Sequence, residues 1–507
     1  MAFRTLLGNA ESVALSPDAR TVAYSVRSSD RDLHATHSGF LANGVPGHAA
    51  GAEIWLTSVP EGARRVLTPD WGSSWCPRWS PEGKLLAFYS DREGEPRIWL
   101  WDRDNDTFHV ACSEPICVAI GFEGVHWCPD SRRLVAKLRT PNWSPPADNV
   151  GDAHLLRQVW MSPHDDRGRS TAKEGWRLFD ACRGDLSLVD VGSGAAWRLG
   201  TEIYPFGTAA SPDGRYVAAM CFADMPSELD GNLGLFDLHL FAVDGSFHCI
   251  LAAKVPARRG TAFSWSPQSD EIAYTSCAGE AGELIVVSRD GTRRMSPSAG
   301  GTCLGNRQGY PPLWSPDGST IYCTTGGSVY AVSRATGEVR DVTGGLGRYV
   351  FGIVHSLESG TVSEFGVPGT VAVMARDGDT LQEGIFRIGA GKPEVIVAES
   401  NRSLVSFLLY GDAQGDWIVG QAEDPASPPD LLGVNVTSGE QRRLTRLNPH
   451  IDIAPQGCRR LISYHGPRGE HLRASLMLPP KPRAREDLSN DHPALLWTGA
   501  VTVQELV

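Results

Sequence analysis

The sequence predicts an all-β protein, a β-propeller of seven or eight four-stranded blades, of which we count eight. The first observation is a repeated unit. In this unit a large or apolar residue precedes Ser-Pro or Cys-Pro, and a polar turn and a short apolar run follow. Six copies begin at Leu15, Trp79, Trp127, Ala210, Trp265 and Trp314. Self-similar units of this kind indicate a repeat architecture in which each unit packs on its neighbours.

The turn chemistry of the unit is the second observation. The copy at Trp314–Gly318 reads Trp-Ser-Pro-Asp-Gly. Proline sets the φ angle of the first corner, aspartate can hydrogen-bond to its own backbone, and glycine accepts a positive φ. The apolar run after the turn favours a strand. A second extended segment follows, as at Ser328–Val332, and a last strand often ends in Leu-Thr. About four strands per unit is the composition of a propeller blade.

These units place the first six blades along the chain. Their expected bounds are about 10–69, 70–118, 125–190, 204–256, 260–304 and 309–345. Blade one contains a long polar loop (30–51), and blade three contains a long insertion (139–182). Because loops of this length are uncommon in compact domains unless they are functional or mobile, the insertion is the segment in which we most expect function.

The repeated motif fades after residue 345. Paired strands at 370–375 and 383–388 predict a degenerate seventh blade, and the segment 408–445 predicts an eighth. Seven blades remain the alternative if this region is one enlarged blade. After residue 449 the pattern changes, so we expect a propeller over 1–449 and a different unit over 450–507. Strands are expected there at 458–464, 472–478 and 493–499.

Composition argues against several classes of partner. The chain has 507 residues, a net charge of −12 and a pI of about 5.6, whereas a nucleic-acid surface usually requires a basic stripe. No apolar run is long enough to cross a membrane, and the N-terminus lacks the apolar core of a signal peptide. The eleven cysteines are scattered and odd in number, which predicts buried reduced thiols. We therefore expect a cytoplasmic protein without nucleic-acid or membrane partners.

One acidic segment has the opening spacing of a calcium loop. Asp102, Asp104 and Asp106 alternate with other residues. The pattern fails later, because Thr107 stands where the loop needs glycine and Ser113 where it needs glutamate. We predict a solvated hairpin turn.

Two other clusters were weighed as metal sites. His34 and His37 could share a metal ion, but no third ligand is placed near them, so we predict a polar loop. Cys112 and Cys117 lack the spacing of a zinc site. We expect neither a metal nor a cofactor.

Two basic pairs and a set of tryptophans have alternative interpretations. Arg258-Arg259 and Arg293-Arg294 are predicted as solvated turn positions at blade edges. The alternative is a pair that faces the channel and binds a substrate carboxylate. The tryptophans that precede the repeated turn are predicted as inter-blade core rather than as a sugar-binding platform. They are Trp79, Trp127, Trp265 and Trp314.

The end of the sequence is more specific than its repeats. In order it contains Pro428–Leu431 (Pro-Pro-Asp-Leu), Arg443–Thr445 (Arg-Leu-Thr), Asn448-Pro449, Ile462–Tyr464 and Ala474–Pro480. This order resembles the last blade and the domain junction of the prolyl oligopeptidase family, which includes the acylaminoacyl peptidases and dipeptidyl aminopeptidases. The resemblance implies that the chain leaves the propeller and enters an α/β-hydrolase domain through these strands. It also implies that the propeller caps the active site and admits short peptides.

The sequence departs from that family where catalysis is expected. Thr498-Gly499-Ala500 stands where the family usually has His-Gly-Gly. The 507 residues contain no Gly-x-Ser-x-Gly nucleophile elbow, and the nearest lookalike, Gly326–Tyr330, lacks the final glycine. A serine becomes a nucleophile at neutral pH only beside a base and an orienting third group. No catalytic residue is therefore carried over to this chain.

Three hypotheses follow. The first is the propeller portion of a serine peptidase, with the catalytic triad outside this sequence and with the 139–182 insertion as a gate or subunit contact. The second is a stand-alone propeller that binds partners without catalysis. The third, a propeller enzyme using channel carboxylates, lacks a paired acid and base. Expected partners are short peptides, a hydrolase domain or a second subunit, with a homo-oligomer left open. Strands after Leu461 without sheet partners favour association, and trimming near Asn448 should improve solubility.

Overall fold

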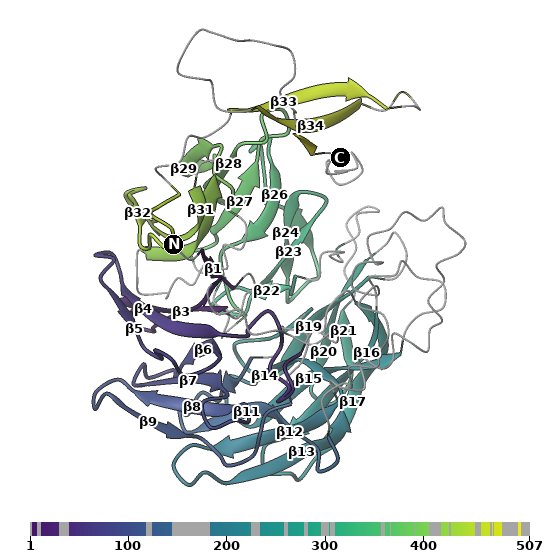
Figure 1. Cartoon of the computed structure of the whole chain (residues 1–507). Helices are drawn as coiled ribbons and strands as arrows, with labels where there is room; N and C mark the ends of the chain where they lie inside the picture. Colours follow the sequence, from purple (N-terminus) through teal and green to yellow (C-terminus); the bar gives the residue numbers. More distant parts are fainter. Residues whose placement is uncertain are drawn as a thin grey trace, which may run out of the picture.

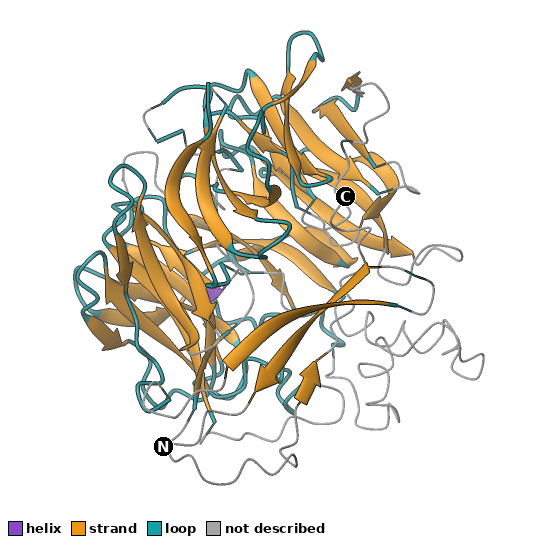
Figure 2. Ribbon diagram, turned by 90° about the horizontal axis from the view of Figure 1, so that it is seen from above, coloured by secondary structure: helices purple, strands orange, loops and turns teal. Residues whose placement is uncertain are grey.

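A computed structural model of the chain describes most of the predicted propeller. The described residues are 3–7, 12–29, 40–117, 124–143, 183–224, 234–257, 262–277, 282–295, 304, 310–355, 360–362, 364–365, 367–389, 391–404, 417–424, 427–451, 458–466, 469, 471–478 and 495–497. Within them, eight antiparallel sheets stand around a common axis (Figures 1 and 2), and a ninth sheet follows at the C-terminal end.

The first four blades follow the chain in order. Blade 1 contains β1 (Arg4–Leu6), β2 (Val13–Leu15), β3 (Thr21–Ser28), β4 (Ala52–Ser58) and β5 (Arg64–Val66). Blade 2 contains β6 (Ser74–Trp79), β7 (Leu85–Ser90), β8 (Arg97–Asp102) and β9 (Thr107–Val110). Blade 3 contains β10 (His126–Trp127), β11 (Arg133–Leu138), β12 (Gly184–Asp190) and β13 (Ala196–Ile203). Blade 4 contains β14 (Pro205–Ala210), β15 (Tyr216–Asp224), β16 (Gly234–Ala242) and β17 (His248–Ala257).

The last four blades and the final sheet continue in the same way. Blade 5 contains β18 (Phe263–Trp265), β19 (Glu271–Ser276), β20 (Glu283–Ser288) and β21 (Arg293–Met295). Blade 6 contains β22 (Leu313–Trp314), β23 (Thr320–Thr325), β24 (Ser328–Ser333) and β25 (Val339–Asp341). Blade 7 contains β26 (Tyr349–Ile353), β27 (Val371–Arg376), β28 (Glu383–Ile388) and β29 (Glu394–Ser400). Blade 8 contains β30 (Trp417–Asp424), β31 (Ser427–Asn435) and β32 (Gln441–Arg443). The final sheet contains β33 (Cys458–His465), β34 (His471–Leu478) and β35 (Leu495–Trp497).

The predicted propeller of eight blades is confirmed, with three differences in its strands. Strand β1 lies before the expected start of blade 1 and pairs with one half of β3, while β2 pairs with the other half. Strand β13 is the outer strand of blade 3 and lies beyond its expected end at residue 190. Strands β26 and β29 of blade 7 were not predicted. These strands lack the repeated turn on both sides, so only pairing with a neighbour identifies them.

The repeated turn is stabilised by its serine as well as by its proline. Ser315 Oγ accepts the backbone N–H of Thr320 at 3.0 Å and donates to Asp317 Oδ1 at 2.6 Å. Asp317 also accepts the N–H of Ser319. These bonds lower the pKa of the Asp317 carboxyl, and the bond from Ser315 has the largest effect. Gly318 has a φ of +70°, as the predicted turn requires. The serines at the corresponding positions of blades 1 and 4 make the same two bonds.

The four tryptophans before the turn join neighbouring blades, as predicted. Each donates its indole N–H to a carbonyl on the inner strand of the preceding blade, at 3.1–3.4 Å. The donor and acceptor pairs are Trp79 with Ala14, Trp127 with Arg78, Trp265 with Ala209, and Trp314 with Ser264. All four side chains are buried, so each supplies apolar contact and also satisfies a carbonyl between two blades.

The Leu-Thr ending of the outer strand also has a structural reason. The threonine hydroxyl accepts a backbone N–H of the neighbouring strand, from the residue fourteen positions earlier. The pairs are Thr68 with Ile54, Thr343 with Val329, and Thr445 with Leu431. The preceding leucine or valine is buried. The dipeptide therefore closes the edge of a blade and fills its core.

Among the described strands, every blade is built from consecutive strands, and side-chain contacts join the first blade to the last. Asn448, which is fully buried, accepts the N–H of Arg4 at 2.7 Å and donates to the carbonyl of Arg4 at 2.6 Å. A shared apolar cluster lies between the first and last blades. Its members include Leu6, Val22, Tyr24, Val419, Leu431, Leu444 and Leu447.

Candidate functional site

Strand direction divides the propeller into two unlike faces. In blades 1 to 6 the repeated turn joins the inner strand to the second strand, so the repeated turns lie at one end of the ring. The turns of adjacent blades also lie close together, which agrees with this placement. A Cβ added to Gly83 in the turn of blade 2 would lie 3.4 Å from Pro17 in the turn of blade 1. The opposite end carries the connections from second to third strands and from one blade to the next. We call this end the long-loop face.

The long-loop face carries the features that sequence analysis linked to function. The predicted insertion of blade 3 starts after β11 and ends before β12, and both strand ends lie on this face. The chain also leaves β32 on this face and continues to the β33–β35 sheet. Residues 144–182 of the insertion lie outside the described residues. The division of the chain at residue 449 stays a prediction.

The root of the insertion is attached to the neighbouring blade. Arg139 forms an ion pair with Glu95 of blade 2, donates to the carbonyl of Ile116 at 3.1 Å, and has its guanidinium carbon 3.9 Å from the ring centroid of Trp143. Burial lowers the pKa of Arg139, and Glu95 opposes this effect. The insertion therefore begins from a fixed point between blades 2 and 3.

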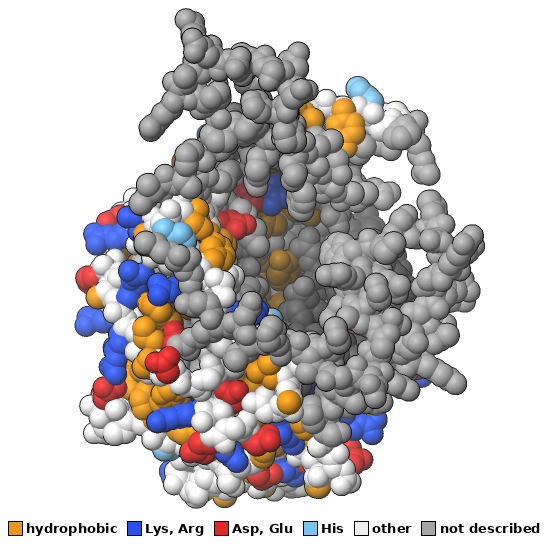
Figure 3. All heavy atoms as spheres, in the orientation of Figure 1, with side chains coloured by type: hydrophobic (Ala, Val, Ile, Leu, Met, Phe, Trp, Pro, Cys, Tyr) orange, Lys and Arg blue, Asp and Glu red, His pale blue; other side chains and the backbone are white. Residues whose placement is uncertain are grey.

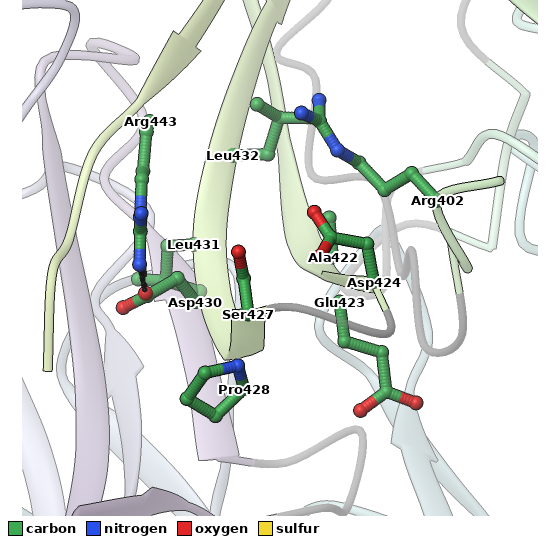
Figure 4. Close-up of a pocket in the computed structure, with 10 residues that line it drawn as sticks. All are labelled: Arg402, Ala422, Glu423, Asp424, Ser427, Pro428, Asp430, Leu431, Leu432 and Arg443. Atoms are coloured by element: carbon green, nitrogen blue, oxygen red, sulfur yellow. Dashed lines mark hydrogen bonds and ion pairs between the residues drawn. The ribbon is translucent and has the colours of Figure 1, made fainter. Parts of the chain in front are cut away.

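A small cavity lies in blade 8 on the same face. Its volume is about 60 Å³, and its lining includes Arg402, Asp424, Ser427, Asp430 and Arg443. Figure 4 shows Arg443 turned toward Asp430 on one side of β31 and Arg402 above Asp424 on the other. Pockets for drug-sized ligands are typically about 300–1,000 Å³. This cavity is too small for a peptide, and it was not anticipated from the sequence.

Arg443 and Asp430 of this cavity already have partners within the fold. Asp430 accepts bonds from Thr445 Oγ1 at 2.7 Å and from the N–H of Leu447 at 3.0 Å, and it pairs with Arg443. Arg443 also donates to the carbonyl of Thr445 at 3.1 Å. Their recorded bonds therefore join strands of blade 8, which is a structural task.

The hydrogen bond from the Leu447 N–H to Asp430 belongs to a recurring carboxylate–backbone bond, the carboxylate device, that sequence reasoning missed. In four blades a carboxylate near the start of the third strand accepts the backbone N–H of the residue seventeen positions later. The pairs are Glu53 with Asp70, Asp185 with Glu202, Asp237 with Lys254, and Asp430 with Leu447. The donors Asp70, Glu202 and Lys254 have positive φ angles. The even spacing is the signal in the sequence that could have identified the device.

Two features of the inner strands bear on the channel. Backbone bonds join Trp314 to Gly360 (3.1 Å) and to Val362 (2.9 Å), so residues 360–362 pair with the inner edge of blade 6. A Cβ on Gly360, whose φ is +63°, would lie 2.9 Å from Cβ of Ser264 in blade 5. This segment therefore covers the channel side of blades 5 and 6. The space-filling view shows a hollow in the middle of the ring (Figure 3).

His126 is the second feature of the inner strands. It lies half-buried on β10, and burial, with the charge of Arg78, lowers the pKa of its imidazole to about 3. His126 is therefore neutral at pH 7 and is unsuited to donate a proton there. Sequence analysis did not single it out.

The other predicted sites fall into three groups. The hairpin over Asp102–Thr107 is confirmed: Asp102 accepts the N–H groups of Asp104 and Asn105, while Asp106 pairs with Arg65. The prediction that Arg293-Arg294 lies in a turn is wrong, because both residues lie in β21, the outer strand of blade 5 and far from its channel edge. Residues outside the described part of the chain are His34, His37, Arg258, Arg259 and Thr498–Ala500.

Among the residues whose side chains the structure describes, eight cysteines form no disulfide bond. Seven are buried and Cys249 is half-buried. Cys112 Sγ lies 3.7 Å from the carbonyl of Glu114, and Cys117 Sγ lies 3.1 Å from that of Arg183. Burial raises the pKa of Cys128 and of Cys323 to about 12. These thiols are therefore core groups rather than nucleophiles.

No group of three or more His, Cys, Asp or Glu side chains in the described part of the chain is arranged to hold a metal ion. In the same residues, no helix has the length and apolar character needed to cross a membrane.

Comparison with known proteins adds relatives of one kind. No family model matches the chain. The uncharacterized peptidase YuxL of Bacillus subtilis is 26% identical over 168 residues, which is 33% of this chain and 24% of that protein. The chain therefore aligns with about a quarter of this curated relative.

Two solved structures share the fold. The acylaminoacyl peptidase of Pyrococcus horikoshii, in an orthorhombic crystal form, has a TM-score of 0.52 at 14% identity, over 96% of this chain and 59% of that one. An acylaminoacyl peptidase in complex with Z-Gly-Gly-Phe-chloromethyl ketone has a TM-score of 0.50 at 14% identity, with the same coverage. The chain thus spans less than two thirds of these proteins. Over its described residues, it has the β-propeller fold found in acylaminoacyl peptidases of the prolyl oligopeptidase family.

Proposed function

We propose that this chain is the propeller part of a serine peptidase of the prolyl oligopeptidase family and restricts access to short peptides. The observation that carries the proposal is that the ring has two unlike faces and that the chain leaves it on one of them. The chain leaves blade 8 on the long-loop face, where the strand ends that flank the blade 3 insertion also lie. A hydrolase unit that follows the β33–β35 sheet would cover this face.

In this proposal the reaction is peptide hydrolysis through an acyl-enzyme. The nucleophile comes from outside the 507 residues, because they contain no Gly-x-Ser-x-Gly. The propeller contributes a filter. Residues 360–362 cover the channel side of blades 5 and 6, which supports exclusion of folded proteins from that route. The partners are short peptides and a hydrolase unit.

The decisive test is the reading frame downstream of codon 507. We expect it, or an adjacent frame, to encode Gly-x-Ser-x-Gly followed by the aspartate and histidine of a triad. A frame and neighbourhood without that segment would overturn the peptidase proposal.

A chemical test addresses the chain itself. The 507-residue protein should not react with a fluorophosphonate probe and should not hydrolyse chromogenic acyl-aminoacyl substrates. A full-length acylaminoacyl peptidase serves as the positive control. Labelling of any serine in this chain would show that a nucleophile lies within the propeller.

A stand-alone binding propeller is the second candidate. The absence of a nucleophile elbow from the 507 residues favours it. The same sequencing test separates the two candidates, since only the peptidase proposal requires a downstream hydrolase segment.

A further inference from the structure

We propose that His239 and His248 form a site for one divalent transition-metal ion at the outer edge of blade 4. His239 lies on β16 and His248 on the neighbouring outer strand β17. Nδ1 of His239 and Nε2 of His248 are 3.0 Å apart. This pair is independent of the proposed peptidase function.

The distance and the ring planes suit a shared ion. Zinc–imidazole bonds are about 2.0–2.1 Å long, so two nitrogens in adjacent positions around one ion are roughly 3 Å apart. The planes of the two rings differ by only 10°, with centroids 5.2 Å apart. Because imidazole binds a metal in its own plane, one ion can lie close to both planes. In the metal-free pair the lone pairs lie along the line between the two nitrogens, so each ring must rotate in its plane by roughly 40° to face one ion.

The metal-free pair is an N–H···N hydrogen bond. One ring donates and the other accepts, so one of the two contacting nitrogens carries a proton. When an ion binds, that proton moves to the other nitrogen of the same ring. Both rings stay neutral, and both contacting nitrogens donate a lone pair.

The surrounding residues hold this arrangement in place. The β16–β17 register pairs His239 with Ile250 and Phe241 with His248. The ring of Phe241 stacks on His248, with centroids 4.4 Å apart and planes within 2°. Burial lowers the pKa of His239, and the charge that His248 would carry when protonated lowers it further, so this ring is neutral at pH 7. Asp237, two residues before His239 on the same face of β16, adds a negative charge.

The ligand set selects a class of ion. Imidazole favours Zn²⁺, Ni²⁺ and Cu²⁺, whereas Mg²⁺ and Ca²⁺ prefer oxygen ligands. Two protein ligands leave the other coordination positions to water or to a group from another molecule. A bound ion would join the outer two strands of blade 4.

Zinc titration of the full 507-residue chain tests this site. Calorimetry at about pH 7.5 should show a site whose affinity falls at least tenfold in His239→Ala and in His248→Ala. His109→Ala is the matched control, because His109 is exposed on β9, the outer strand of blade 2, and should leave zinc binding unchanged. Circular dichroism checks that each variant is folded.

A site-resolved measurement removes the contribution of other histidines. Diethyl pyrocarbonate acylates accessible imidazoles, and mass spectrometry reports each one. Zn²⁺ should protect His248 in the wild-type chain but leave His109 reactive. Equal zinc affinity in the wild type and in the double variant H239A/H248A, or unchanged acylation of His248 with zinc, would overturn the proposal.

Discussion

Ser315 shows at the residue scale why the repeated motif recurs. Its hydroxyl accepts one backbone N–H and donates to the aspartate of the same turn, so one buried atom connects both ends of the turn. Trp314, immediately before it, is fully buried and bonds to blade 5. Adjacent residues thus serve two purposes: the serine shapes the turn, and the tryptophan joins the blades.

Replacement of Ser315 tests its role in the turn. Ser315→Ala should lower the free energy of unfolding by about 1–3 kcal/mol, because the Thr320 N–H loses its side-chain acceptor and Asp317 loses one of its donors. The matched control is Ser246→Ala. Ser246 also bonds an aspartate two residues away, at 2.6 Å, but its turn is exposed. Urea denaturation of both variants checks the prediction, and equal losses would contradict it.

Histidines whose pKa is lowered by burial give the fold a dependence on acid. Burial lowers the pKa of His355, whose Nδ1 donates to the carbonyl of Ile353 at 2.9 Å, and that of His126. The unfolded chain therefore binds more protons at moderately acidic pH. Stability is fully present above the ordinary histidine pKa of about 6.5 and is lost as the pH falls below it.

The expected size follows from linkage. Each such histidine should contribute a slope of up to about 1.4 kcal/mol per pH unit below pH 6.5. Denaturation measured from pH 7.5 to 5 should show this fall, and His355→Asn should reduce its slope. The exposed residue His109 supplies the control variant His109→Asn. A slope unaffected by the His355 change would refute the assignment.

At the scale of elements, a blade is joined across its strands by a few side chains. The threonine of the Leu-Thr ending accepts a backbone N–H of the third strand. A carboxylate on that strand accepts a backbone N–H of the chain after it leaves the fourth strand. In blade 8, Asp430 accepts hydrogen bonds from both the Thr445 hydroxyl and the Leu447 N–H. The outer strand of this blade, β32, is short, so these bonds replace part of its pairing.

Asp430→Ala should therefore loosen blade 8. We expect a loss of about 2–3 kcal/mol, because the variant leaves buried donors without an acceptor. Glu440→Gln is the control, since Glu440 and Arg442 form an ion pair with both side chains 46% exposed. Such pairs contribute about 1 kcal/mol or less. Hydrogen exchange should rise around Leu447 in the first variant only.

At the scale of the molecule, ring closure depends on residues far apart in sequence. Asn448 bonds both backbone groups of Arg4, and an apolar cluster joins blades 1 and 8. The same closure sets the direction in which the chain leaves the ring. The chain then leaves β32 on the long-loop face and continues to the β33–β35 sheet.

Asn448→Ala tests the closure. We expect a loss of about 2 kcal/mol or more, because two backbone groups of Arg4 lose their partners. Hydrogen exchange should increase in blades 1 and 8 and stay unchanged in blade 4. Asn105→Ala is the control, since Asn105 lies in an exposed hairpin turn. Uniform exchange changes around the ring would contradict a local closure.

The ring closure also refines where the chain can be shortened. The sequence suggested trimming near Asn448, but removal of Asn448 itself would remove its two bonds to Arg4. A chain of residues 1–451 should stay folded and associate less than the 507-residue chain, because among the described residues β33 and β35 each pair with β34 alone. Light scattering compares the two chains. Equal association would show that the final sheet is not the contact.

The sequence by itself determined the propeller, because its turn chemistry is local: proline, aspartate and glycine act within a few residues of one another. It also identified the tryptophans as inter-blade core, since a residue repeated once per blade must meet the next blade. It did not reveal β1, β13 or the carboxylate device, which depend on pairing across a sheet. The two unlike faces, the covered channel edge and the His239–His248 pair also required the tertiary structure. Each of these features joins residues whose contact is set by strand register and ring closure, and neither is encoded in a local pattern.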